Sequence, residues 1–193
     1  LALVHNGVVE NYLELKAKLT KAGHKFVSET DTEVLAHLVG DAFAQSKAKV
    51  EDRLVDAVRQ AIKQVQGTLG IAVIHSDLPG LVVGARRGSP LVIGIGQGEN
   101  FLASDTQALA PYTNRVVILQ DQEVVALKAE RYDIASPLGI KSDVKVEEIE
   151  NGVTASDKGS YPHYMLKEIF EQVSSIQNAF RGRLDPDGAT AKL

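Results

Sequence analysis

The 193-residue chain carries 21 Lys and Arg against 25 Asp and Glu, so its formal charge is −4 and no basic surface predicts nucleic acid as a partner. Hydrophobic residues make up 44% and charged residues 24%, which is typical of a globular protein, and no apolar run approaches the roughly 18 residues of a membrane span. The chain contains no Cys, which excludes a disulfide, a thiolate metal site or a cysteine nucleophile from within it. Since no signal-peptide pattern is found, the expected compartment is the cytoplasm.

The first residues, Leu1-Ala2-Leu3-Val4, form an apolar run that is typical of the inside of a buried strand. A domain seldom begins in mid-strand, so we expect the chain to be a fragment whose upstream part is missing. Asn6-Gly7 interrupts the run, and both residues tolerate a positive φ. Residues 1–9 are therefore predicted to form a strand, a turn and a second strand.

Three helices are predicted after this turn. Asn11 and Glu14 have the spacing of a capping box that opens the first helix, and Gly23 is suited to end it. Thr30 and Glu33 have the same spacing and open the second helix. The remaining elements of this half are a short strand at 25–28 and a third helix at about 51–65.

The second half of the chain changes to short apolar strands separated by turns. The predicted strands are 69–75, 81–86, 91–95, 100–104, 115–120, 123–128 and 131–134, with one helical turn at 105–109. The turn signal Asp77-Leu78-Pro79-Gly80 makes the first two strands a hairpin, and the next two are also expected to pair. Helices followed by strands with short links predict an α+β fold, in which antiparallel sheets are covered by helices.

The last part of the chain is predicted to form a separate segment. Residues 151–160 are polar and rich in turn formers, which is typical of a linker. Residues 163–180 have the period of an amphipathic helix, and Gly182 is placed to end it. Residues 185–193 are expected to be an unstructured tail.

Asn6-Gly7 is also a candidate catalytic element. On its own the pair is most often a two-residue hairpin turn. Alternatively, the Asn6 side-chain amide and the Gly7 backbone N–H point at one spot, where two donors stabilise the oxyanion of a tetrahedral intermediate. The two interpretations are compatible, because a turn at a strand end can aim both donors.

Asp31 is a candidate ligand-binding residue at the start of the second helix. An acidic residue in the first turn interacts favourably with the positive end of the helix dipole, which is the ordinary explanation. Because Thr30 and Glu33 are expected to satisfy the cap, the Asp31 carboxylate is instead free to face a ligand. A carboxylate suits the α-ammonium group of an amino acid.

Several segments carry a resemblance to a known family. They are Val4-His5-Asn6-Gly7-Val8-Val9-Glu10-Asn11, residues 26–34, residues 85–94, Ser104-Asp105, residues 157–159 and residues 163–169. In order and spacing they resemble the glutaminase domains of the glucosamine-6-phosphate synthase family (glutamine–fructose-6-phosphate aminotransferases), which are class II glutamine amidotransferases. The resemblance covers nearly the whole chain. Its last segment resembles that family's connection from the glutaminase domain to the sugar-isomerase domain.

The resemblance implies an N-terminal-nucleophile hydrolase fold with αββα layers and antiparallel sheets, here without its N-terminal strands. Residues 1–150 would form a partial glutaminase domain, and residues 151–193 a linker and helix leading to an absent isomerase domain. Asn6 and Gly7 would form the oxyanion hole as catalytic elements, and Gly7 and Asp31 would bind the substrate. The Asp31 carboxylate would receive the amino group of glutamine.

In that family an N-terminal cysteine attacks the side-chain amide of glutamine, and the released ammonia aminates fructose-6-phosphate. Since this chain has no cysteine, we expect the 193 residues alone to be inactive. The implied partners are L-glutamine, the missing N-terminal segment and the isomerase domain, in a parent enzyme expected to be a homo-oligomer. No cofactor, metal, nucleic acid or membrane is expected to take part.

Other interpretations remain open on the sequence alone. The chain could be a non-catalytic binding module of the same fold, or the glutaminase part of another class II amidotransferase, although residues 163–169 argue against the second. Arg86 and Arg87 could clamp an anion, or could be solvated or paired with acidic residues. A hard-metal site at Asp31, Glu33 and His37 is conceivable, but no second cluster completes it.

Overall fold

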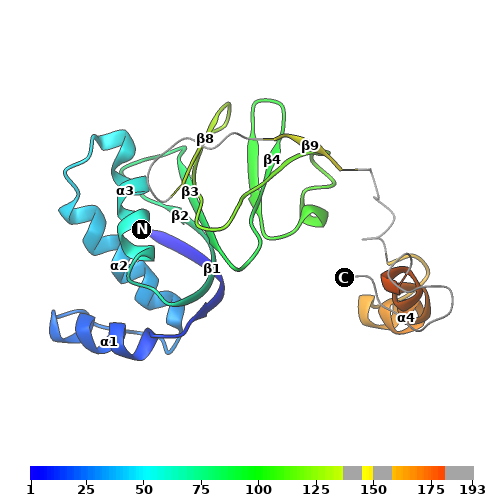
Figure 1. Ribbon diagram of the computed structural model, residues 1–193, viewed down its shortest axis with the longest axis horizontal. Coiled ribbons are helices and arrows are strands. Elements are labelled where there is room, and N and C mark those ends of the chain that lie inside the picture. The colour runs from blue at the N-terminus through cyan, green and yellow to red at the C-terminus, as the bar shows by residue number, and fades with distance from the viewer. Residues whose placement is uncertain (137–144, 150–157, 181–193) are drawn as a thin grey trace. The chain divides into compact units, whose positions relative to one another are not determined.

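Figure 1 shows the computed structural model of the protein, which describes residues 1–136, 145–149 and 158–180. The chain divides into two compact units, Leu1–Gly152 and Val153–Leu193. Each unit is described by itself below.

The first unit contains a five-stranded antiparallel sheet in the order β1-β2-β3-β7-β8. Its strands are β1 (Ala2–Val9), β2 (Gly67–Ile74), β3 (Val82–Arg87), β7 (Val124–Leu127) and β8 (Tyr132–Ala135). The predicted hairpin between β2 and β3 is confirmed. β1 lies at one edge and pairs only with β2 in the described residues.

A second antiparallel sheet has the order β5-β4-β6-β9. Its strands are β5 (Asn100–Ala103), β4 (Val92–Ile95), β6 (Arg115–Ile118) and β9 (Glu147–Glu148), and the short helix η2 (Thr106–Ala108) follows β5. The predicted pairing of β4 with β5 is confirmed, as is the helical turn. Apolar side chains from both sheets form a core between them, including Ile93 of β4 and Val125 of β7.

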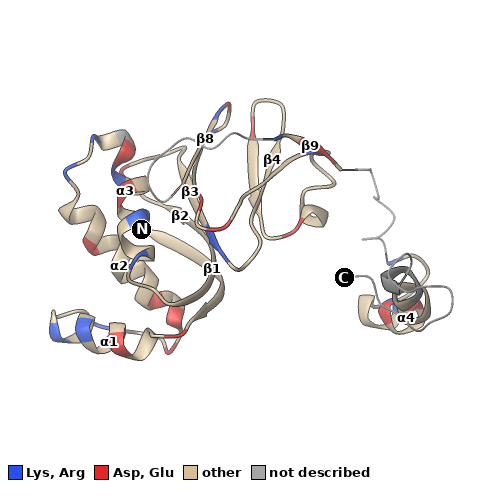
Figure 2. Ribbon diagram, viewed as in Figure 1, with Lys and Arg blue, Asp and Glu red and all other residues tan. Residues whose placement is uncertain are grey.

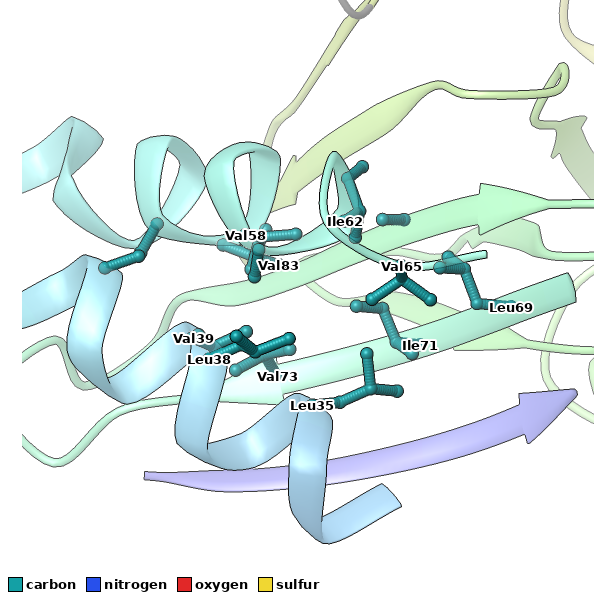
Figure 3. Packing of buried hydrophobic residues seen from close by; sticks show 14 of the residues in the cluster. Leu35, Leu38, Val39, Val58, Ile62, Val65, Leu69, Ile71, Val73 and Val83 are labelled. Atoms are coloured by element: carbon teal, nitrogen blue, oxygen red, sulfur yellow. The ribbon is translucent and has the colours of Figure 1, made fainter. Parts of the chain in front are cut away.

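Helices cover the other face of the five-stranded sheet (Figure 1). They are α1 (Tyr12–Lys21), α2 (Asp31–Gln45), η1 (Val50–Asp52) and α3 (Arg53–Ile62). Figure 3 shows how α2 and α3 pack on the sheet, with Leu35 and Val58 facing Ile71 and Val83. These four side chains are at most 1% exposed, and each contributes roughly 1.5–3 kcal/mol by leaving water. This packing fixes the start of α2 beside β1.

Asn6-Gly7 does not form the predicted turn, because β1 runs without a break from Ala2 to Val9. Its whole length pairs with β2, in a register that places Asn6 opposite Gly70 and Gly7 opposite Leu69. Eight cross-strand pairs therefore outweigh the local preference of Asn-Gly for a hairpin. The prediction of two short strands joined by a turn is wrong.

Both predicted capping boxes are also wrong. Asn11 makes no cap hydrogen bond; its side chain donates to the Gln64 carbonyl at 3.0 Å and accepts from the Gln66 amide at 2.9 Å. The side chain of Thr30 likewise does not cap α2. Glu33 instead accepts hydrogen bonds from the Val27 and Ser28 amides in the loop before the helix. The strand predicted at 25–28 is absent.

The second unit contains α4 (Tyr164–Phe180), which confirms the helix predicted at 163–180. The predicted stop at Gly182 and the predicted tail lie outside the described residues, as does most of the predicted linker. No helix in the part of the chain that the structure describes combines the length and apolar character needed to cross a membrane.

Candidate glutamine site at the edge of the first sheet

Asp31 is the first residue of α2, and its carboxylate reaches the edge strand β1. Its Oδ2 atom accepts a hydrogen bond from the Val9 amide at 2.8 Å. Its Oδ1 atom receives no hydrogen bond from the described residues and lies 3.8 Å from His5 Nδ1. One carboxylate oxygen is thus held in place, and the other remains available to a cation.

His5 packs its buried side chain against this carboxylate. Its side chain is 1% exposed, whereas that of Asp31 is 25% exposed. The ring nitrogens of His5 also lie 3.3 Å from Thr32 Oγ1 and 3.5 Å from the carbonyl oxygen of Thr68. The imidazole therefore fills the space between β1, β2 and the first turn of α2.

Gly7 lies between His5 and Val9 on the strand and has φ of +142°. A Cβ atom at this position would lie 2.3 Å from the Thr68 carbonyl oxygen, so only glycine fits. Antiparallel pairs alternate between hydrogen-bonded and non-bonded positions. Since the Glu10 amide donates to the Gln66 carbonyl, we infer that the odd-numbered amides of Gly7 and Val9 face away from β2.

Asn6 projects from the opposite face of β1. Burial alternates along the strand: His5 and Val9 face the helices, whereas Val4, Asn6 and Val8 are exposed. The Asp31 carboxylate thus contacts β1 at His5 and Val9, on the face of the strand opposite to that of the Asn6 side chain. Asn6 and Gly7 belong to β1, which pairs only with β2 among the described residues, so the other edge of the strand is free there.

Glu33 fixes the loop that leads into α2. Its carboxylate accepts hydrogen bonds from the Val27 amide at 2.8 Å, the Ser28 amide at 2.7 Å and the Ser28 hydroxyl at 2.6 Å. The Ser28 hydroxyl and then the Val27 amide are the main causes that lower the pKa of Glu33 from 4.5 to about 2. Glu33 is thus ionised at neutral pH, and its hydrogen bonds to Val27 and Ser28 fix the loop that precedes α2 and Asp31.

The conceivable metal site is not assembled. Glu33 Oε1 lies 3.7 Å from His37 Nε2, while Asp31 points to β1. The described residues contain no group of three or more His, Cys, Asp or Glu that could hold a metal ion.

The contacts of His5 and the Val9 amide with Asp31 are not predicted from the sequence, because Asn6-Gly7 is interpreted there as a turn. In a continuous strand, the period of two places His5, Gly7 and Val9 on one face. That alternation was the signal that would have identified both groups.

The comparisons with known proteins now decide the family. Residues 1–111 match the glutamine amidotransferase domain family.

The chain belongs to this family.

The chain is also similar over nearly its whole length to proteins named glutamine–fructose-6-phosphate aminotransferase (isomerizing). It is 46% identical over 193 residues to that of a Thermus thermophilus strain, 43% over 187 residues to that of Thermotoga maritima, and 44% over 186 residues to that of Methanosarcina mazei. These alignments cover 100%, 97% and 95% of the chain, but only 31%, 30% and 30% of the relatives. The chain thus spans less than a third of the length of these relatives.

A solved structure confirms the fold class predicted for this chain. The glutamine phosphoribosylpyrophosphate amidotransferase from B. subtilis aligns with a TM-score of 0.57 and 25% sequence identity. The alignment covers 70% of this chain and 29% of that one. The helix and antiparallel sheet layers are those of the N-terminal-nucleophile amidotransferases.

Proposed function

We propose that the chain forms the glutamine-binding part of a glutamine–fructose-6-phosphate aminotransferase, which makes glucosamine-6-phosphate from fructose-6-phosphate and glutamine. The similarity over nearly the whole chain supports this assignment. Residues 1–150 serve as part of the glutaminase domain. Residues 151–193 serve as the link to a sugar-isomerase domain.

One observation carries the glutamine site: Asp31 is held at the edge strand by one carboxylate oxygen, while the other oxygen accepts no hydrogen bond from the described residues. The Val9 amide orients Oδ2, and the buried His5 ring supports the carboxylate from the other side. The unused Oδ1 atom binds the α-ammonium group of glutamine by a charge-assisted hydrogen bond. Because Asp31 is only 25% exposed, this contact is partly shielded from water.

The oxyanion hole is formed by the Gly7 amide, with the Asn6 side-chain amide as the second donor. The glutamine side chain lies along the free edge of β1. There the Gly7 backbone amide and the Asn6 side-chain amide both reach the oxygen of its amide carbonyl. Two such donors at about 2.7–3.1 Å stabilise the tetrahedral intermediate formed when a nucleophile attacks the amide.

The attacking thiolate comes from outside the 193 residues, because these contain no cysteine. The chain by itself therefore releases no ammonia from glutamine. A coupled assay for ammonia measures this, and turnover above that of buffer contradicts it.

L-Glutamine binding to the 193-residue chain, measured by calorimetry, tests the site. Asp31→Asn keeps an acceptor for the Val9 amide but removes the charge, so we expect affinity to fall about 10- to 100-fold. Glu29→Gln is the matched control, because this exposed residue lies two positions away and loses the same charge. Equal affinities for the two variants would contradict the assignment of Asp31.

A second candidate is a module of the same fold that binds glutamine without catalysis, which the absence of cysteine favours. A preparation that joins this chain to the segment preceding it in its own reading frame separates the two functions. Ammonia release supports the aminotransferase, whereas glutamine binding without ammonia release supports the binding module.

A further inference from the structure

A hollow lined by cationic side chains lies where the end of α3 meets the end of β3. Its volume is about 70 Å³, several times the roughly 10–15 Å³ that one water molecule needs. It therefore has room for a small tetrahedral anion. The lining residues, which we call the basic pocket, are Arg59, Ile62, Lys63, Arg86, Arg87 and Gln122.

Four of these six side chains are cationic, in a chain whose net charge is −4. Among the described residues, one ion pair involves these cations: it joins Arg86 Nε and Asp121 Oδ1 at 3.5 Å, and the Asp121 side chain is 58% exposed. From the described residues, Arg59 and Lys63 receive no carboxylate partner. Figure 2 shows how Lys and Arg (blue) recur along α3, which carries Arg59. Cations gathered around one hollow repel each other, and an anion between them relieves this repulsion.

Arg87 forms the fixed wall of the basic pocket. Its guanidinium donates to the carbonyl oxygens of Gly67 at 3.0 Å, Ile62 at 3.2 Å and Val65 at 2.9 Å. The Ile62 carbonyl belongs to the last residue of α3, so Arg87 also neutralises the negative end of the helix dipole. Among the described residues, Arg87 therefore binds backbone carbonyls, and not the acidic residues that the sequence allowed as one alternative.

One donor in the basic pocket lacks an acceptor. The Nε atom of Arg59 is buried and has no hydrogen-bond partner among the described residues. Arg86 is engaged on two sides, because its Nη1 atom donates to the Leu119 carbonyl and its Nε atom lies 3.5 Å from Asp121 Oδ1. Buried N–H groups are rarely left unpaired in native proteins, because desolvation without a partner is unfavourable. An anion in the hollow supplies an acceptor for Arg59.

The backbone at the rim is strained as well. Gln122 has φ of +67° and is the only non-glycine residue with a positive φ in the described part of the chain. Its amide donates to the Arg86 carbonyl at 2.7 Å, which holds the turn between β6 and β7 against β3. Strain of this kind concentrates at ligand sites.

Stabilisation of the helix end explains some of these cations, since basic residues in a last turn interact well with the dipole. It does not explain the unpaired Nε atom of Arg59 or the strained turn at Gln122. We propose that the basic pocket binds a phosphate group, either as free inorganic phosphate or as the phosphate of a small monoester. This site is separate from the glutamine site and does not depend on it.

Calorimetric titrations of the 193-residue chain with inorganic phosphate and with phenyl phosphate, at constant ionic strength set with chloride, test this proposal. We expect saturable binding of at least one of the two. Tighter binding of phenyl phosphate assigns a phosphate monoester, and tighter binding of inorganic phosphate assigns the free anion. Absence of saturable binding by both would overturn the proposal.

The double variant Arg59→Gln, Lys63→Gln is expected to raise the Kd about tenfold or more. Its control is Lys21→Gln, Lys25→Gln, which removes the same charge at two exposed positions. Equal weakening in both would show a general charge effect and would overturn the site. Should the double variant not fold, Lys63→Gln alone, at an exposed position, gives the same comparison with Lys21→Gln.

Discussion

The backbone amide of Val9 and the carboxylate of Asp31 are joined by a 2.8 Å hydrogen bond across 22 residues of chain. Val9 is the last residue of the edge strand β1 and Asp31 is the first residue of α2, so this bond connects the two elements that carry the proposed site. It also explains why an acidic residue at the helix start is oriented toward the strand.

Gly7→Ala is expected to destabilise the protein by roughly 1–3 kcal/mol or more, because the new methyl group meets the Thr68 carbonyl and φ is +142°. Gly40→Ala is the control: Gly40 lies inside α2 with no atom within 4 Å of the added Cβ. There we expect stabilisation of about 0.5–1 kcal/mol. Urea unfolding measures both, and equal changes would contradict the close approach of β1 and β2 at Gly7.

Arg87→Ala removes a donor from three carbonyl oxygens at and after the end of α3, so we expect a loss of roughly 2–4 kcal/mol. Of the three, the Ile62 carbonyl keeps another donor, the Val65 amide at 3.3 Å. Arg115→Ala at an exposed position of β6 should change stability by no more than about 0.5 kcal/mol. Hydrogen exchange gives a local test, since amides at the end of α3 should lose protection in the first variant only. Unchanged exchange there would rule out the capping role.

Stability should depend on Glu33 in acid. Its folded pKa is lowered from 4.5 to about 2, so its contribution is fully present above pH 4.5 and is lost as the pH falls toward 2. The stability difference between the native chain and Glu33→Gln should therefore shrink across this interval. Urea midpoints measured at a series of pH values test this.

The control for that series is Glu29→Gln, since Glu29 is exposed. It should parallel the native chain throughout. A difference between native and Glu33→Gln that stays constant from pH 4.5 to 2 would show that the carboxylate is not stabilised by Ser28 and Val27.

Elements governed by their own residues were predicted well from the sequence. The hairpin of β2 and β3 and the helix α4 follow from apolar period and turn chemistry. The failures came from partners distant in sequence. Asn11 binds residues more than 50 positions away, and Asn6-Gly7 is straightened by pairing with β2.

The arrangement of the candidate site residues differs from the one that the sequence predicts. Asp31 was expected to be free because other residues capped the helix, whereas in the structure the Val9 amide holds one of its oxygens. Asn6 and His5 lie on opposite faces of β1 because the strand is continuous. A predicted turn at Asn6-Gly7 does not indicate this. Strand register, which long-range pairing sets, decides both points.

The most direct test of the account compares two ligands that differ only in the α-ammonium group: L-glutamine and 5-amino-5-oxopentanoate. The affinity of each for the native chain and for Asp31→Asn is measured by calorimetry. The account predicts that the substitution weakens L-glutamine about 10- to 100-fold and leaves the ligand without the ammonium unchanged. Equal weakening of both ligands, or of neither, would contradict a direct contact between Asp31 and the ammonium of glutamine.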